Sequence, residues 1–312
     1  MTAWRIVIGA VLAAAFAEIA SADRYERRTL RLDAKAREFF IHTPDRTPRG
    51  ANLPLMLVLH GGGAASAEGL RESYGFRPLV ERGEFIAVYP SAFNKAWAMG
   101  GAPTADRRNP RPDHDDVAFL DAVIDAVIAE HPIDTSRLYV SGASRGGSMT
   151  QWYAPRSRYR FAGAGTVITS MVRSIGEGFS LPQPLTWVMM IGDKDPFMPY
   201  EGRSADQRRD DMLAVDEIVT LLNRANGVSG PPSLTAVLGD PDGRRSCGNE
   251  LREWRDAGSG AVTAVVRLYG GSHVMPGSWQ CKDFNHAEAM WRYFAAAAPR
   301  PQPAGAQRPP PP

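Results

Sequence analysis

The sequence lacks the features that define several large classes of protein. Its 312 residues carry a formal net charge of only +2, and Lys and Arg are scattered along the chain, so the basic surface of a nucleic-acid-binding protein is missing. No nucleotide or flavin fingerprint occurs, and we therefore expect no cofactor. No internal repeat is visible. With 44% apolar residues, the chain has the composition of one ordinary globular domain.

A membrane-spanning run, which takes about 20 apolar residues, is also missing. The N-terminus instead has Arg5, an apolar stretch from Ile6 to Phe16, and the small residues Ala20-Ser21-Ala22 that a signal peptidase cleaves after. Glu18 interrupts the end of the stretch, which argues against a membrane anchor. We therefore predict that residues 1–22 are a signal peptide and that the mature protein is secreted or periplasmic, with no membrane span.

Cysteine is scarce: the chain contains two, Cys247 and Cys281. In an oxidising compartment an even pair is more often a disulfide than two free thiols, so we predict that they are bonded. Closing this loop would contribute roughly 3–4 kcal/mol through chain entropy. The loop encloses His273, and we expect the bond to steady the segment that carries it. The alternative is two buried thiols without a role.

Apolar runs alternate with helical patterns along the rest of the chain. A loose alternation over 28–41 predicts two antiparallel strands. Continuous runs, typical of strands covered on both faces of a parallel sheet, occupy 53–59, 85–89, 137–140, 161–168, 185–191 and 262–269. Helices are predicted over 117–128, 148–153, 210–226 and 285–296. This alternation indicates the α/β class, with a mostly parallel central sheet and helices on both faces.

The boundaries of this domain follow from composition. We assign it residues 23–298. Residues 299–312 are almost entirely Pro, Gln, Ala, Gly and Arg, and we predict a disordered tail there.

A candidate nucleophile lies between a predicted strand and a predicted helix. Gly142-Ala143-Ser144-Arg145-Gly146 matches the G-x-S-x-G nucleophile elbow of the α/β-hydrolase fold, and the match occurs once. Such a turn needs glycines because neighbouring backbone comes too close for a Cβ atom. It also places the serine hydroxyl at a helix N-terminus, where developing negative charge is favoured. We predict that Ser144 is the nucleophile; the alternative is a tight turn in which the serine is incidental.

The base and the acid follow from chain order, since this fold places them after the serine with the acid first. Among six histidines, His273 and His286 come late enough. His286 falls inside a predicted helix, whereas His273 follows a strand on a glycine-rich loop, so we choose His273. For the acid, Asp193 and Asp195 compete. Pro196 holds the preceding residue extended, which favours Asp195 as the group that orients the imidazole.

The oxyanion hole is expected in His60-Gly61-Gly62-Gly63, which follows an apolar strand. Glycines let the backbone approach a substrate and aim N–H groups at its oxyanion. We assign the backbone amides of Gly62 and Arg145, with that of Gly63 as an additional donor. His60 is predicted to hold the loop and not to carry a proton.

A second cluster, Asp113-His114-Asp115-Asp116, has the residue types of a metal site. Carboxylates at a helix start explain it as well, because they complement the helix dipole. No second ligand cluster with metal spacing appears, so we predict no metal.

The chain resembles the polyhydroxybutyrate depolymerase and feruloyl-esterase-like esterases, a secreted branch of the α/β hydrolases. The resemblance covers most of the mature chain through ordered motifs: Leu57-Val58-Leu59-His60-Gly61-Gly62-Gly63, Asp115-Asp116-Val117-Ala118-Phe119, His131-Pro132-Ile133-Asp134, Arg137-Leu138-Tyr139-Val140-Ser141-Gly142, Asp195-Pro196-Phe197-Met198-Pro199-Tyr200-Glu201-Gly202, and Gly270-Gly271-Ser272-His273 with Pro276-Gly277. It implies a Ser-Asp-His triad at Ser144, Asp195 and His273.

Two departures from the family concern the substrate pocket. Arg145 stands where members often have Asn, and Met275 stands where a Trp is common. The resemblance implies that Met275 borders the substrate. It implies the same for Trp97, although core packing is an equally good interpretation of that residue.

These observations predict a secreted serine carboxylesterase that works through an acyl-enzyme. Its partner would be an ester: a small acyl ester, a hydroxyalkanoate oligomer or an acylated polysaccharide. The alternatives are an exported serine peptidase with the same triad and an inactive hydrolase-fold protein that binds ligands.

Overall fold

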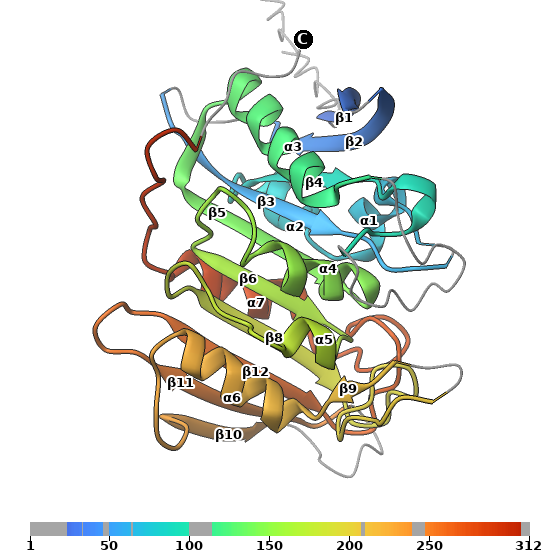
Figure 1. The fold of residues 1–312 in the computed structure, drawn as a ribbon, viewed down its shortest axis with the longest axis vertical. Coiled ribbons are helices and arrows are strands. Elements are labelled where there is room, and N and C mark those ends of the chain that lie inside the picture. Colours follow the sequence, from blue (N-terminus) through green and yellow to red (C-terminus); the bar gives the residue numbers. More distant parts are fainter. Residues whose placement is uncertain are drawn as a thin grey trace, which may run out of the picture.

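The structure is a computed structural model that describes residues 24–32, 34–45, 50–63, 65–99, 114–206, 210–238 and 247–306. The predicted signal peptide, residues 1–22, lies outside the described residues. One large sheet of ten strands forms the centre of the fold (Figure 1). Its strands lie in the order β1 (Arg24–Leu32), β2 (Lys35–Thr43), β4 (Ile86–Pro90), β3 (Leu53–Leu59), β5 (Ile133–Ala143), β6 (Gly163–Val167), β8 (Thr186–Gly192), β12 (Val262–Leu268), β11 (Asn249–Arg255) and β10 (Leu234–Leu238).

The centre of the sheet is parallel and its two edges are antiparallel. Every pair from β4 across to β12 is parallel. The β1–β2 and β2–β4 pairs on one side, and the β12–β11 and β11–β10 pairs on the other, are antiparallel. A separate two-stranded ribbon joins β7 (Met171–Val172) to β9 (Met212–Leu213). The parallel centre confirms the predicted sheet type.

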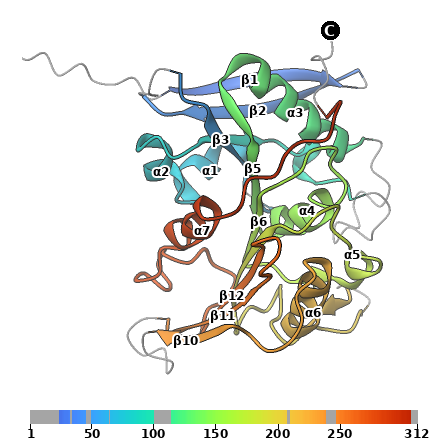
Figure 2. The ribbon, with the colours of Figure 1, turned by 90° about the vertical axis from the view of Figure 1, so that its left-hand side faces the viewer.

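Helices cover both faces of the sheet (Figure 2). One face carries α1 (Ala67–Ser73), α2 (Arg77–Glu81) and α7 (His286–Ala295). The other carries α3 (Asp116–Glu130), α4 (Arg145–Tyr153), α5 (Arg173–Gly176) and α6 (Val215–Ala225). A short 3₁₀ turn, Phe93–Lys95, follows β4. Across the described ranges, none of these helices combines the length and the apolarity needed to cross a bilayer.

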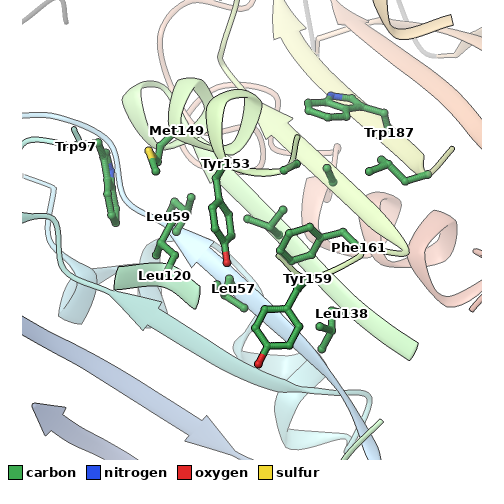
Figure 3. Close-up of a cluster of buried hydrophobic side chains, with 14 of the residues drawn as sticks. Leu57, Leu59, Trp97, Leu120, Leu138, Met149, Tyr153, Tyr159, Phe161 and Trp187 are labelled. Carbon is green, nitrogen blue, oxygen red and sulfur yellow. The ribbon is translucent and has the colours of Figure 1, made fainter. Parts of the chain in front are cut away.

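This layering explains why β3 reads as a continuous apolar run. All seven of its residues are buried, because successive side chains point to opposite faces and both faces are covered. Leu57 and Leu59 join the core beneath α3 and α4, which Figure 3 shows with Tyr153 of α4. Met56 and Val58 join the core beneath α1 and α7.

The predicted strands of the parallel centre are confirmed. At the edge formed by β11 and β10, the prediction is incomplete. The helix predicted over 210–226 begins only at Val215, because residues 212–213 pair with β7. The strands β10 and β11 were not predicted. Four of the seven β11 residues are charged, which hides the strand in a search for apolar runs.

The tail boundary predicted at residue 299 is wrong for its first eight residues. The Arg300 N–H donates to the Ser136 carbonyl at 2.7 Å. The Gln302 side-chain amide donates to the carbonyls of Thr135 and Arg160, both at 2.8 Å. Composition could not reveal these bonds, because backbone carbonyls accept them. Residues 307–312 lie outside the described residues.

Candidate active site

Three side chains predicted to act together lie at the carboxyl edge of the parallel strands. Ser144 directly follows β5, Asp195 comes three residues after β8, and His273 comes five residues after β12. Because parallel strands end at the same edge of a sheet, loops from different strands can meet there. The topology therefore brings three distant parts of the chain to one edge.

Ser144 occupies a strained turn between β5 and α4. Its backbone angles are φ 53° and ψ −120°, a region that side-chain-bearing residues rarely adopt. The turn is so tight that a Cβ atom at Gly142 would lie 2.2 Å from the Gly146 carbonyl oxygen. A Cβ atom at Gly146 would lie 2.0 Å from the Leu59 oxygen. These close contacts explain why both positions of the motif are glycine. Backbone strain like that at Ser144 is common at functional sites, where it orients a reactive side chain.

The three side chains form a continuous hydrogen-bonded chain. His273 Nε2 lies 2.9 Å from Ser144 Oγ, and His273 Nδ1 lies 2.7 Å from Asp195 Oδ2. A carboxylate can only accept, so Nδ1 carries the imidazole proton and Nε2 is left to accept the serine hydroxyl proton. The histidine is partly exposed, whereas the Asp195 side chain is completely buried.

Asp195 is buried at little cost because each of its oxygens has a partner. Oδ1 accepts the backbone N–H groups of Phe197 and Met198 at 2.9 and 2.8 Å, which leaves Oδ2 for the imidazole. The competing Asp193 lies elsewhere: it accepts from the Arg267 guanidinium and from the Gly270 N–H at 2.8 Å. Asp193 therefore ties the end of β12 to β8 and does not reach the imidazole.

The loop that carries His273 is held from several sides. Cys247 and Cys281 form a disulfide, which confirms that the two cysteines are paired. Within the loop, the backbone and hydroxyl of Ser272 both donate to Gln280 Oε1. His286 lies 2.7 Å from the Pro276 carbonyl and 2.8 Å from the Tyr74 carbonyl, so it joins this loop to the end of α1. Burial lowers the pKa of His286.

The glycine loop after β3 lies against the serine turn. A Cβ atom at Gly61 would lie 3.5 Å from Ser144 Cβ, and one at Gly62 would lie 2.7 Å from Arg145 Cδ. Arg145 is the first residue of α4, and the first N–H groups of a helix have no partner within it. Gly61 therefore lies against the serine turn, and Gly62 lies against the side chain of Arg145.

His60 holds this glycine loop through three bonds. Its Nδ1 lies 2.7 Å from the Gly61 carbonyl, and its Nε2 accepts the Ala92 N–H at 3.0 Å. The Trp97 indole N–H donates to the His60 carbonyl at 2.8 Å. Burial lowers the pKa of His60, in keeping with a neutral ring.

Trp97 does not lie where a substrate contact was predicted. It is 3% exposed and belongs to the core beneath α3 and α4 (Figure 3), so the structure supports the core-packing interpretation. Its part in the site is indirect, through the His60 carbonyl.

Met275 does border the pocket at Ser144. This cavity has a volume of about 200 Å³, and its walls include both Ser144 and His273. The remaining lining is mostly apolar or small: Gly61, Gly62, Ala65, Leu70, Ser73, Tyr74, Ala143, Ile168 and Met275. The α1 residues among them were missed because no periodic pattern marks that seven-residue helix.

Phe197 was also missed as a neighbour of the site. Its ring lies edge-on to the His273 ring with centroids 5.2 Å apart, yet the side chain is 65% exposed. Its position two residues after the predicted acid is a signal that sequence reasoning could have used.

The acidic cluster at residues 113–116 has structural partners where it is described. Asp115 caps α3 by accepting the N–H groups of Val117 and Ala118. Asp116 is buried and forms an ion pair with Arg37 while accepting the Ala98 N–H at 2.6 Å. Asp113 lies outside the described residues. The predicted helix-start role of Asp115 is therefore confirmed.

Comparison with known proteins identifies esterases. Esterase NocK of Nocardia uniformis subsp. tsuyamanensis is 29% identical over 72% of this chain and 66% of its own length. Feruloyl esterase C of Aspergillus terreus is 26% identical over 63% of this chain and 69% of its own. Poly(3-hydroxyalkanoate) depolymerase C of Paucimonas lemoignei is 31% identical over 42% of this chain and 30% of its own. These relatives confirm the resemblance found in the sequence. No family model matches the chain.

Solved structures confirm the fold class. Acetyl xylan esterase from Aspergillus awamori aligns with a TM-score of 0.58 at 15% identity, covering 87% of this chain and 100% of that one. An acylaminoacyl peptidase aligns with a TM-score of 0.55 at 11% identity, covering 90% of this chain and 42% of that one. At such identities the likeness shows the fold alone. The chain has the α/β-hydrolase fold, which esterases and peptidases share.

Proposed function

We propose that this chain, an α/β-hydrolase with sequence similarity to feruloyl esterases and a hydroxyalkanoate depolymerase, is a serine carboxylesterase. The observation that carries the proposal is the hydrogen-bonded series Ser144–His273–Asp195 beside an apolar pocket. A hydroxyl, an imidazole and a buried carboxylate in this order form the arrangement of a nucleophile, its base and the group that orients the base.

Acylation begins when Ser144 Oγ attacks the carbonyl carbon of the ester. Its proton passes to His273 Nε2, 2.9 Å away, and the carbonyl oxygen takes up the negative charge. The backbone N–H groups of Gly62 and Arg145 stabilise that oxygen, an interaction worth about 3–4 kcal/mol per donor. When the intermediate collapses, the bond to the alcohol oxygen breaks and Nε2 returns the proton to that oxygen.

Deacylation repeats the steps with water. The water gives a proton to His273 Nε2 and its oxygen attacks the acyl carbon on Ser144. Collapse of the second intermediate returns the proton to Ser144 Oγ and releases the acid. Throughout, Asp195 Oδ2 accepts the Nδ1–H at 2.7 Å and stabilises the imidazolium that forms in each half-reaction.

The substrate is an ester, and three classes remain candidates: small acyl esters, hydroxyalkanoate oligomers and acylated polysaccharides. The names of the relatives favour all three over a peptide. An exported peptidase remains the second candidate, because the fold does not separate the two reactions. An inactive binding protein would retain the fold without the bond from His273 to Ser144.

We also propose that the protein acts outside the cytoplasm. The disulfide between Cys247 and Cys281 supports an oxidising compartment. The signal-peptide pattern in residues 1–22 agrees with this.

A labelling experiment tests the proposed nucleophile. A fluorophosphonate should add covalently to the wild-type protein, and peptide mass mapping should place the adduct on Ser144. Ser144→Ala should remain unlabelled and lose hydrolysis of p-nitrophenyl acetate while keeping the wild-type circular dichroism spectrum. An adduct elsewhere, or ester hydrolysis by the Ser144→Ala variant, would overturn the proposal. Hydrolysis of a peptide anilide at a greater kcat/KM than any ester would favour the peptidase.

A further inference from the structure

A second, larger cleft opens beside the pocket at Ser144. It has a volume of about 780 Å³, and the two cavities share Ser73 and Met275 in their walls. One wall of the cleft is residues 274–279, which continue directly from His273. The opposite wall comes from the end of α1 and the start of α2, and includes Glu72 and Arg77. The cleft therefore extends the pocket on the side of the histidine loop.

Trp279 projects from this wall with 68% of its surface exposed. Among the exposed large apolar side chains in the described part of the chain, two are aromatic, Phe197 and Trp279. Both lie on the segments that carry Asp195 and His273. A large apolar side chain left exposed at the rim of a site is a candidate contact for a ligand.

The loop beneath Trp279 is fixed although the indole is exposed. The Ser278 N–H and hydroxyl both donate to the Met275 carbonyl, and the Gly277 N–H donates to the Cys281 carbonyl. The disulfide of Cys281 and the contact of His286 with Pro276 anchor the same loop. Because the backbone of the loop is held in place, it loses little conformational entropy when a ligand stacks on the indole that it carries.

The direction of the reaction determines which half of the ester meets this platform. His273 Nε2 must return its proton to the departing alcohol oxygen, so the alcohol has to leave on the side of the imidazole. Residues 274–279, which follow His273 directly in the chain, line the cleft. The pocket at Ser144, about 200 Å³ and mostly apolar, is left for a short acyl group.

We propose that the cleft is a subsite for the alcohol half of the substrate, and that this half is a saccharide stacked on Trp279. The inference rests on the proposed esterase function and names its substrate class. Sugar rings present C–H faces to an indole and hydroxyl groups at their edges. The cleft supplies both kinds of partner, since its lining includes Trp279 and the polar residues Glu72, Arg77, Ser278, Lys282 and Asn285.

The polar lining favours a saccharide over a polyester. Arg77 donates to both Glu72 and Glu81, which orients hydrogen-bonding groups along one wall. A hydroxyalkanoate chain has ester acceptors but no internal donors, so the carboxylate of Glu72 would gain no partner from it. Sugar hydroxyls can both donate to Glu72 and accept from Arg77 or Lys282.

Three substrates with one acyl group test the subsite: p-nitrophenyl acetate, a monoacetylated disaccharide and ethyl 3-acetoxybutyrate. Release of acetate is measured for each, so that only cleavage of the acetyl ester is compared; that cleavage forms the same acetyl-enzyme from all three, and the ethyl ester of the third is not counted. Trp279→Ala should raise KM for the acetylated disaccharide about tenfold with kcat unchanged, because one stacking contact is lost. KM for the other two esters should stay within about twofold. Trp279→Phe should restore part of the loss.

The matched control is Val237→Ala, which removes another exposed apolar side chain, on β10. It should leave all three KM values unchanged. Equal effects of Trp279→Ala on the three esters, or no effect, would overturn the subsite. An effect confined to the acetoxybutyrate would replace the saccharide by a polyester.

Binding separates this inference from the proposed function. In the Ser144→Ala background, calorimetry should detect the acetylated disaccharide, and the additional change Trp279→Ala should weaken its binding about tenfold. If wild type cleaves none of the three esters, the esterase proposal fails while this titration still decides the subsite. Absence of binding to Ser144→Ala would overturn the subsite directly.

Discussion

His273 Nε2 lies 2.9 Å from Ser144 Oγ, although 129 residues separate them in sequence. Their strands are not neighbours, because β6 and β8 lie between β5 and β12. The loop after β12 must therefore reach across two strands to meet the serine. This reach explains why the loop is held by a disulfide, by Gln280 and by His286.

The two aspartates after β8 should separate clearly in kinetics. Asp195→Asn should lower kcat by about 10⁴-fold, because an amide in place of the carboxylate favours the wrong imidazole tautomer. Asp193→Asn is the matched control, since it bonds to Arg267 and Gly270 and not to the imidazole. Hydrolysis of p-nitrophenyl acetate by both variants measures the difference. A larger loss of kcat in Asp193→Asn would show that the acid is wrongly assigned.

The serine turn should not tolerate a methyl group. Gly146→Ala would place a Cβ atom 2.0 Å from the Leu59 oxygen, a backbone atom that cannot move aside cheaply. We expect the free energy of unfolding to fall by more than about 2 kcal/mol. Gly258→Ala is the control, because its nearest neighbour would be a carboxylate oxygen at 3.6 Å. Denaturant unfolding curves compare the two, and similar midpoints would contradict the packing described at the turn.

Removing the disulfide should affect both stability and activity. The bond closes a loop with a sequence separation of 34, so replacing both cysteines by Ser should lower the free energy of unfolding by about 3–4 kcal/mol. Since the loop positions His273, kcat should fall as well at temperatures where the variant is still folded. Unfolding curves and ester hydrolysis measure the two effects. A variant with wild-type kcat would show that the histidine loop holds its position without the bond.

Stability should decrease on acidification below about pH 6.5. Burial lowers the pKa values of His42, His60, His131 and His286 below 6.5. Below about pH 6.5 the unfolded chain takes up protons on these histidines more readily than the folded chain does. The free energy of unfolding therefore has its full value above about pH 6.5 and falls as the pH approaches the lowered pKa values. Urea unfolding between about pH 8 and pH 5 measures this. His131→Gln should reduce the slope of the free energy of unfolding against pH by at most about 1.4 kcal/mol per pH unit. A flat profile over this range would contradict the prediction.

Most of the parallel sheet could be predicted from the sequence, and so could the order of the serine, the acid and the histidine along the chain. Strands such as β3 are covered on both faces, so burial leaves a continuous apolar run that is visible without coordinates. The serine turn could be predicted because its glycines follow from close backbone approach. Asp195 is favoured over Asp193 through Pro196, whose ring restricts the residue before it, together with the resemblance to the esterase family.

The parts that could not be predicted depend on contacts between distant segments. Trp97 is a large aromatic near a loop, and its sequence position does not reveal that its indole bonds to the His60 carbonyl. Gln302 lies in a proline-rich segment but bonds to Thr135 and Arg160. In both cases the partner is a backbone carbonyl, which every residue carries and no sequence pattern marks.

The most direct test of the account is a rapid-mixing experiment on p-nitrophenyl acetate. The central claim is that Ser144 becomes acylated before water releases the acid. The wild-type protein should therefore release nitrophenol in an initial burst equal to the concentration of active sites, followed by slower turnover. His273→Ala and Ser144→Ala should show no burst. A burst of wild-type size in Ser144→Ala would contradict the account.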